Sequence, residues 1–318
     1  MRIIFLGTGE FGVESLTALI RAGHEVVQVV SQPNRPAGRG RAVQPTAIHA
    51  HADRLGLSHL QTADINALAP SEIAHGAELG VVAAFGQKIG PAWLQALPRG
   101  MINLHASLLP RYRGAAPFQW AILNGDATTG VTVFQLDERW DAGPVWGRRE
   151  TPIGELETAD ELHDRLALLG AEMLPDCLVR IARNDAPMPQ DATAATRAPK
   201  LTKADGFVDW TLPAARVARR IHGLWSWPGA AVDCELCSGK RERILLSRAR
   251  VAEVATAEKR FAPGELDADG AVACGEGRVL LLEVKPAGGK LMSFDAFRNG
   301  RSGAPHGGLL RLLPPTRE

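Results

Sequence analysis

Short apolar runs alternate with amphipathic stretches through the first half of the chain, and this alternation limits the fold more than any other feature. The apolar runs predict strands over residues 1–6, 24–30, 78–85, 100–107 and 130–136. Several of them are apolar on both faces, which is typical of parallel strands covered by helices on both sides. The stretches between them predict helices over residues 13–22, 45–56, 117–125 and 156–182. We therefore expect an α/β domain with a mostly parallel sheet.

The character of the sequence changes beyond residue 184. Ala, Pro and Thr dominate there without periodicity, so we expect a linker, which we place at residues 190–205. A helix is then predicted over residues 215–225, followed by strands over 229–236, 243–251, 270–275 and 278–288. Many short strands between turn residues favour a small β-barrel or sandwich. The 318 residues therefore predict two domains, over residues 1–189 and 206–318.

Cysteine usage and the absence of long apolar runs indicate a cytoplasmic protein. Cys177, Cys234, Cys237 and Cys274 are too few and too irregularly spaced for a disulfide framework, so we expect a reducing compartment. No apolar run approaches the roughly 20 residues that span a bilayer. Met1 leads directly into a predicted strand, which leaves no room for a signal peptide.

The side chains most typical of metal ligands show no ligand spacing. Cys234 and Cys237 form a Cys-x-x-Cys pair, but no second pair and no paired histidines accompany them, so a zinc or redox role is disfavoured. The remaining candidates are better explained as surface or structural histidines: His49, His51, His75, His163 and His306. We therefore expect no metal.

Charge is distributed unevenly along the chain. Residues 1–189 carry 16 Lys and Arg against 20 Asp and Glu, whereas residues 190–318 carry 20 against 15. A basic second part favours a polyanionic partner such as nucleic acid, although ordinary surface variation gives the same count.

The segment GTGEFG matches Gly-x-Gly-x-x-Gly at Gly7, Gly9 and Gly12, between a predicted strand and a predicted helix. This is the layout of a dinucleotide-binding turn, which also requires an acidic residue at the end of the second strand. The next acidic residue after that strand is Asp53, so the pattern fails for NAD. An NADP-dependent oxidoreductase stays open in weaker form, through Arg35, Arg39 and Arg41.

Two polar side chains interrupt the apolar strand predicted over residues 100–107. Asn103 and His105 face the same way on a strand, while Leu104 faces the opposite way, toward a helix. Polar groups at the C-terminal ends of parallel strands are typical of ligand sites. Asn is an amide donor, His transfers protons near neutral pH, and Asp141 in a later loop can orient His105 or accept a proton. The structural alternative is that Asn103 caps a turn and His105 is a buried, satisfied histidine.

Residues 103–117, NLHASLLPRYRGAAP, resemble the signature of the 10-formyltetrahydrofolate-dependent formyltransferases, Asn-x-His followed by Ser-Leu-Leu-Pro. The similarity is greatest to the members that formylate methionine on initiator tRNA. Further similar segments lie at residues 32–40, 125–137, 200–210 and 285–300, so the resemblance covers nearly the whole chain. It implies a Rossmann-like first domain that binds folate and no dinucleotide, followed by an OB-like β-barrel that holds tRNA.

The resemblance also implies roles for individual residues. Asn103, His105 and Asp141 match the catalytic trio of the family. The folate-lining segment is matched by Ser107, Leu108, Leu109 and Pro110. Residues that meet the tRNA are matched by Arg39, Arg41 and Lys203. Beside the aspartate, Arg139 and Trp140 stand where the family usually has Gly and Leu.

The implied reaction moves the formyl group of 10-formyltetrahydrofolate to the α-amine of methionine on initiator tRNA. The implied enzyme is a monomer that needs no metal or nicotinamide cofactor and has no membrane partner. An amino-sugar nucleotide as acceptor, or water as in a formyl-folate hydrolase, is the alternative within the family. Outside it, a non-catalytic tRNA-binding module explains the basic second part but gives no reason for Asn103, His105 and Asp141 together.

Overall fold

The structure is a computed structural model. It describes residues 1–37, 42–236, 241–252, 261–267, 270–300 and 309–313. The chain separates into two compact units: the first comprises residues 1–117, 128–152 and 163–198, and the second comprises residues 118–127, 153–162 and 199–318.

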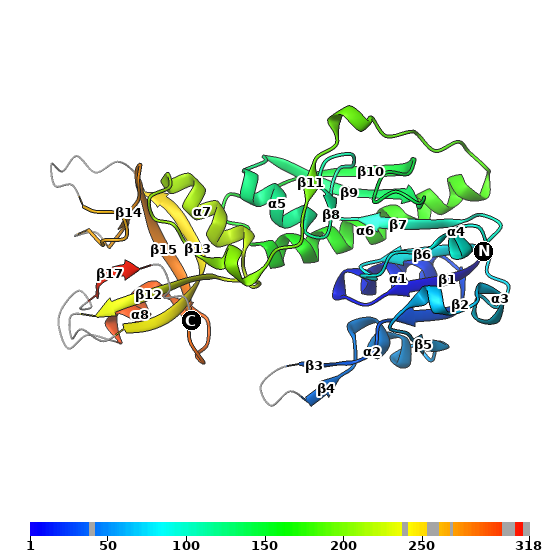
Figure 1. The fold of residues 1–318 in the computed structure, drawn as a ribbon, viewed down its shortest axis with the longest axis horizontal. Helices are drawn as coiled ribbons and strands as arrows, with labels where there is room; N and C mark the ends of the chain where they lie inside the picture. Colours follow the sequence, from blue (N-terminus) through cyan, green and yellow to red (C-terminus); the bar gives the residue numbers. More distant parts are fainter. Residues whose placement is uncertain (38–41, 237–240, 253–260, 268–269, 301–308, 314–318) are drawn as a thin grey trace. The chain divides into compact units, whose positions relative to one another are not determined.

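The first unit is built on a seven-stranded sheet with the order β10-β9-β7-β6-β1-β2-β5 (Figure 1). Five neighbouring strands are parallel: β5 (His59–Gln61), β2 (Glu25–Ser31), β1 (Arg2–Gly7), β6 (Leu79–Ala83) and β7 (Met101–His105). Two strands extend the sheet antiparallel: β9 (Thr128–Gln135) and β10 (Val145–Pro152). The mostly parallel α/β sheet expected from the sequence is confirmed, and the strand predicted over residues 130–136 joins it in the antiparallel sense.

Helices pack on this sheet as their apolar periodicity predicts. The described helices of this unit include α1 (Val13–Arg21), α2 (Ala47–Arg54) and α6 (Ala159–Ala182), with the short α3 (Pro70–Ile73) and α4 (Pro91–Leu94). The side chain of Leu104 on β7 packs against Gly170 of α6, where an added Cβ would come within 2.5 Å of it. Helix α6 therefore covers the face of β7 opposite Asn103 and His105.

Pro and Gly in the segment after β2 predict a loop, but the structure has a short antiparallel hairpin there. Strand β3 (Arg35–Ala37) pairs with β4 (Ala42–Gln44), so backbone pairing overrides the composition of the segment. Arg39 and Arg41 lie outside the described residues.

Part of the segment expected as a linker is hydrogen-bonded to the first unit. Just before this segment, Met188 exchanges two backbone hydrogen bonds with Val145, at 2.6 and 2.9 Å. Farther on, β11 (Arg197–Ala198) pairs in parallel with β8 (Arg113–Gly114). The boundary between the two units falls after Ala198.

The second unit contains α5 (Pro117–Asn124, apart from Pro117), α7 (Ala214–Gly223), α8 (Phe294–Asn299) and an antiparallel sheet. The sheet has the order β14-β15-β13-β12-β17, and β16 (Met292–Ser293) pairs with β15. Its strands are β12 (Ala230–Leu236), β13 (Arg241–Ala252), β14 (Val272–Ala273), β15 (Arg278–Pro286) and β17 (Leu309–Leu313). Glu265 and Leu266 bridge Arg311 of β17 and Val272 of β14, so the sheet is nearly closed. The predicted barrel is confirmed.

The cysteines that the structure describes are buried thiols. Cys234 is fully buried in the core of the second unit, and Cys237 lies outside the described residues, so their pairing stays untested. Burial raises the pKa of the Cys177 and Cys274 thiols to about 11, which leaves them protonated near neutral pH.

Among the helices that the structure describes, none combines the length and apolarity needed to cross a membrane.

Candidate active site

Asn103 and His105 lie at the C-terminal end of β7, where the parallel strands of an α/β sheet present ligand sites. Asn103 is half-buried, and only 6% of His105 is exposed. The shared face of the two side chains, opposite Leu104, follows from the two-residue period of the strand.

The backbone fixes one ring nitrogen of His105, Nε2, as a hydrogen-bond donor. This nitrogen lies 2.9 Å from the carbonyl oxygen of Tyr112, and a carbonyl oxygen only accepts, so Nε2 carries a hydrogen and donates it. The other nitrogen, Nδ1, faces Oδ2 of Asp141 at 4.0 Å. The edge of the ring packs at a right angle to Phe134, with ring centroids 6.4 Å apart. Nδ1 is therefore the nitrogen of His105 that can exchange a proton with Asp141 or with a bridging water.

The loop that carries Asp141 is held by hydrogen bonds from two other segments of the chain. Oδ2 of Asp141 accepts a hydrogen bond from the backbone N–H of Gly114 at 2.8 Å. Nε2 of Gln190 donates to the carbonyl oxygens of Asp141 at 3.0 Å and Gly143 at 2.8 Å. The backbone of Asp141 has a φ of +49°, an uncommon conformation that Asp tolerates better than most residues.

Glycine is required at two backbone positions that pack beside Asp141, namely Gly114 and Gly143. A Cβ on Gly114 would lie 2.4 Å from the carbonyl oxygen of Ala198, and one on Gly143 would lie 1.8 Å from that of Gln135. The backbone of the site is therefore packed too closely for any side chain at these two positions.

An open cleft of about 410 Å³ lies at this end of the sheet. It is lined by residues 82, 87–89, 103, 136, 137 and 139–141, so Asn103 and Asp141 both face it. His105 does not line it and lies behind Asp141. The cleft thus presents one amide and one carboxylate to a ligand, with the imidazole supporting the carboxylate from inside.

The two residues that depart from the family pattern form one rim of the cleft. Arg139 is tied back to Asp137, with Nη2 at 2.6 Å and Nε at 3.1 Å from Oδ2. Trp140 is 63% exposed although it is large and apolar. The arginine charge is therefore partly neutralised, and the indole is free to contact a planar ligand.

The segment from Ser107 to Pro110 does not line this cleft. Oγ of Ser107 donates to the carbonyl oxygen of Arg111 at 2.7 Å, and the Ser107 carbonyl accepts from Oγ1 of Thr132 at 2.7 Å. Leu109 is buried against Phe134 and Val145. These contacts support the loop after β7, and the folate-lining role of Ser107, Leu108, Leu109 and Pro110 stays a prediction.

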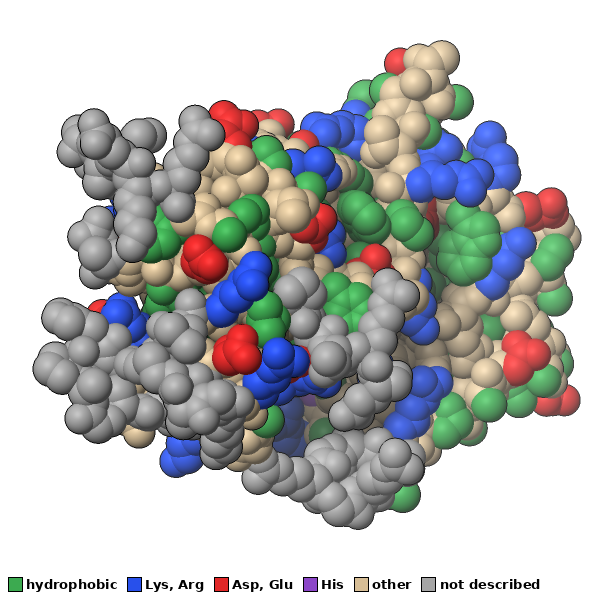
Figure 2. Space-filling view, turned by 60° about the vertical axis from the view of Figure 1, so that its left-hand side comes forward, with side chains coloured by type: hydrophobic (Ala, Val, Ile, Leu, Met, Phe, Trp, Pro, Cys, Tyr) green, Lys and Arg blue, Asp and Glu red, His purple; other side chains and the backbone are tan. Residues whose placement is uncertain are grey.

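Only one of the three residues expected to meet tRNA is described. Lys203 is exposed at the start of a 3-10 helix (Lys203–Gly206) in the second unit. On the face shown in Figure 2, Lys and Arg side chains occur in several groups with Asp and Glu between them.

The glycine-rich turn after β1 has a packing role. A Cβ on Gly7 would lie 2.8 Å from the ring of Phe5, and one on Gly12 would lie 3.2 Å from the carbonyl oxygen of Ala83. The N–H groups of Thr8 and Gly9 both donate to the carbonyl oxygen of Ala84, at 3.2 and 3.3 Å. Two donors that a dinucleotide pyrophosphate would need are therefore used by the chain itself.

Sequence reasoning did not identify Gln190 or the backbone groups of Tyr112 and Gly114. The backbone groups leave no trace in residue type. Gln190 lies in a segment without periodicity, so no sequence pattern marks it.

Comparisons with known proteins agree with the resemblance found in the sequence. The family described as "Formyl transferase" matches residues 1–178, and "Formyl transferase, C-terminal domain" matches residues 200–302. The methionyl-tRNA formyltransferase of Methylobacterium sp. (strain 4-46) is 42% identical over 321 residues, covering 100% of this chain and 99% of that protein. That of Ruegeria pomeroyi (strain ATCC 700808 / DSM 15171 / DSS-3) is 41% identical over 303 residues, covering 94% and 97%.

Solved structures share the fold. HypX from Aquifex aeolicus in complex with tetrahydrofolic acid aligns with a TM-score of 0.62 at 20% identity, over 93% of this chain and 46% of that chain. Both matched domains and the full-length relatives confirm the family predicted from residues 103–117. The chain belongs to the formyl transferase family, among its methionyl-tRNA formyltransferases.

Proposed function

We propose that this enzyme transfers the formyl group of 10-formyltetrahydrofolate to the α-amine of methionine carried by initiator tRNA. The observation that carries the proposal is the approach of His105 to Asp141, 4.0 Å apart, with Asn103 and Asp141 facing one cleft. The full-length similarity to methionyl-tRNA formyltransferases supports the choice of acceptor.

The chemistry proceeds by attack of the free amine on the formyl carbon. The new N–C bond forms as negative charge develops on the formyl oxygen, and the bond from carbon to N10 of the folate then breaks. The amide of Asn103 is the donor that faces the developing oxyanion, where one preorganised donor contributes roughly 3–4 kcal/mol by analogy with acyl transfer. His105 acts through Asp141 and not as a second donor to the oxyanion, because its Nε2–H is taken by Tyr112 and its Nδ1 faces Asp141.

A proton leaves the attacking amine and is delivered to N10. Asp141 is the carboxylate at the cleft, and Nδ1 of His105 stands behind it, so the pair accepts the proton and returns it, directly or through water. Such acid–base help typically contributes roughly 10²- to 10⁴-fold in rate. The hydrogen bond from the backbone N–H of Gly114 to Oδ2 holds the carboxylate in position at the cleft.

The two substrates are assigned to different parts of the chain. The cleft beside Asn103 and Asp141 takes the folate, with residues 107–110 as a further part of its site, as in the family resemblance. Residues 1–189 form the catalytic domain, 190–205 connect the domains, and 206–318 bind the tRNA together with Arg39, Arg41 and Lys203. The excess of basic residues beyond residue 190 supports this assignment.

We assign the enzyme as a monomer in the cytoplasm, where charged tRNA is available. The deciding experiment measures formyl transfer from 10-formyltetrahydrofolate to initiator methionyl-tRNA, with uncharged tRNA and an amino-sugar nucleotide as parallel acceptors. Formylmethionine on the charged initiator alone is the expected result. Transfer to the sugar nucleotide alone would refute the acceptor and leave the family chemistry intact.

A further inference from the structure

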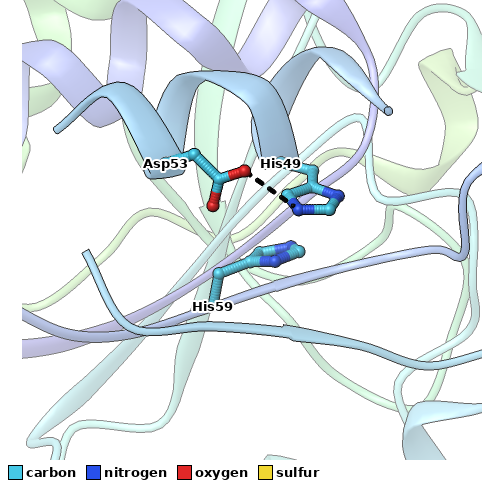
Figure 3. A group of neighbouring side chains, drawn as sticks. All are labelled: His49, Asp53 and His59. Carbon is cyan, nitrogen blue, oxygen red and sulfur yellow. Dashed lines mark ion pairs between the residues drawn. The ribbon is translucent and has the colours of Figure 1, made fainter. Parts of the chain in front are cut away.

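Two histidines and an aspartate meet at the β5 edge of the first sheet, away from the cleft. His49 and Asp53 lie one turn apart on α2, and His59 is the first residue of β5 (Figure 3). Nε2 of His49 lies 3.1 Å from Oδ2 of Asp53, and one ligand atom from each of the three residues lies within 4.8 Å of the others. None of the three lines the cleft that contains Asn103 and Asp141.

Each histidine has an acceptor for the hydrogen of the nitrogen that would not bind an ion. Nδ1 of His49 lies 3.0 Å from Oδ1 of Asn34 and 2.5 Å from the side-chain nitrogen of Gln61, which itself donates to Asn34. For Nε2 to offer its lone pair toward Asp53, Nδ1 carries a hydrogen and donates it to Asn34, which requires the Gln61 amide nitrogen to move away from the ring. Oγ of Ser31 donates its hydrogen to the carbonyl of Gln32, so it accepts from Nε2–H of His59 at 3.0 Å. The Nδ1 lone pair of His59 is then available.

Hydrogen bonds at the outer ring nitrogens are typical of metal-binding histidines. A ligating imidazole usually donates its other N–H to a nearby oxygen, which fixes the ring orientation and the tautomer. Two imidazoles and one carboxylate suit Zn²⁺ and related first-row ions, with a fourth position left to water. We propose that His49, Asp53 and His59 form a Zn²⁺-class site that links α2 to β5.

Binding needs a small adjustment of the site. The two rings are stacked, with centroids 4.1 Å apart and planes at 20°, so their lone pairs now run nearly side by side. A shared ion requires the His59 ring to tilt while its Nε2 stays on Ser31. The Asp53 side chain is 63% exposed and moves easily to complete the set.

The site has a structural role, because it lies outside the cleft and holds two elements of the fold together. Asn34 immediately precedes β3, so the ion also fixes the base of the β3–β4 hairpin. The inference is independent of the proposed function, since it concerns a different part of the molecule.

The test is Zn²⁺ binding by the full-length protein after dialysis against a chelator, followed by isothermal titration and competition with a chromogenic chelator. We expect one ion per chain, a higher Tm with Zn²⁺, and at least tenfold weaker binding by Asp53→Asn and by His59→Gln. Asn34→Ala keeps all three ligands and should weaken binding about 10- to 100-fold.

A matched control is His163→Gln, which removes a histidine from a separate pair, where Nδ1 lies 2.9 Å from Asp164. It should bind Zn²⁺ like the unmodified protein. Equal affinity in the unmodified protein, Asp53→Asn and His59→Gln would overturn the proposal, and so would a loss confined to His163→Gln. Circular dichroism of each variant separates loss of the site from loss of the fold.

Discussion

Replacing Gln190 by alanine tests how the loop that carries Asp141 is held in place. The side chain of Gln190 donates to two carbonyl oxygens of that loop, at 3.0 Å on Asp141 and 2.8 Å on Gly143. The φ of Asp141 is +49°, and such a backbone conformation costs about 1–3 kcal/mol unless the surroundings support it. Gln190 supplies part of that support from a segment 49 residues farther along the chain.

The expected effect follows from the two bonds. Each neutral hydrogen bond contributes about 0.5–1.5 kcal/mol net, so their loss removes about 1–3 kcal/mol from the observed loop conformation. This is as large as the strain at Asp141, so the loop relaxes and Asp141 leaves its position beside His105 for part of the time. Because roughly 1.4 kcal/mol corresponds to tenfold in rate, we expect kcat to fall between about 5-fold and about 150-fold.

The assay is formyl transfer to initiator methionyl-tRNA at saturating substrates, beside thermal unfolding of each variant. Gln190→Glu keeps an acceptor for Arg113, whose Nη2 lies 2.7 Å from Oε1, but it cannot donate to the two carbonyls. It should therefore lose activity as Gln190→Ala does. Asp191→Ala is the control, because it removes the adjacent side chain, which accepts hydrogen bonds from the N–H of Thr193 at 2.9 Å and from its Oγ1 at 2.7 Å, and leaves the contacts of Gln190 in place. Full activity of Gln190→Glu would refute the reasoning.

Three further outcomes are expected. Asn103→Ala should lower kcat about 10²- to 10³-fold with little change in the KM for folate; a raised KM at unchanged kcat would contradict the oxyanion role. Trp140→Leu should change the free energy of unfolding by less than about 0.5 kcal/mol, because the side chain is 63% exposed. It should raise the folate KM roughly twofold to tenfold through lost ring contact, and an unchanged KM would remove Trp140 from the folate site. Burial lowers the pKa of His222 from 6.5 to about 4, so the unfolded chain binds the proton first as the pH falls. The free energy of unfolding, measured with denaturant, should therefore fall by about 3 kcal/mol between pH 6.5 and pH 4. The variant His222→Gln should show a flatter pH dependence.

Much of the fold could be predicted from the sequence, because the hydrophobic periodicity of helices and strands is a local property of the chain. Runs that are apolar on both faces predicted the parallel strands, and the two-residue spacing of Asn103 and His105 predicted their shared face. The sequence left the pairing of β9 undetermined, because strand direction depends on the path of the chain between strands. Composition predicts a loop where β3 and β4 pair, because Pro and Gly there favour turns. Two paired strands of three residues each are too short to leave a clear alternation in the sequence.

The sequence alone determined the kinds of groups at the site: an amide, an imidazole and a carboxylate, with a family signature around them. Which nitrogen of His105 can exchange a proton depends on the folded chain, because the carbonyl of Tyr112 takes the other one. The tertiary structure also brought Gln190 to the Asp141 loop and His59 to the side of His49. These contacts join residues that are not sequence neighbours, often through backbone atoms, and such contacts leave no periodic pattern along the chain.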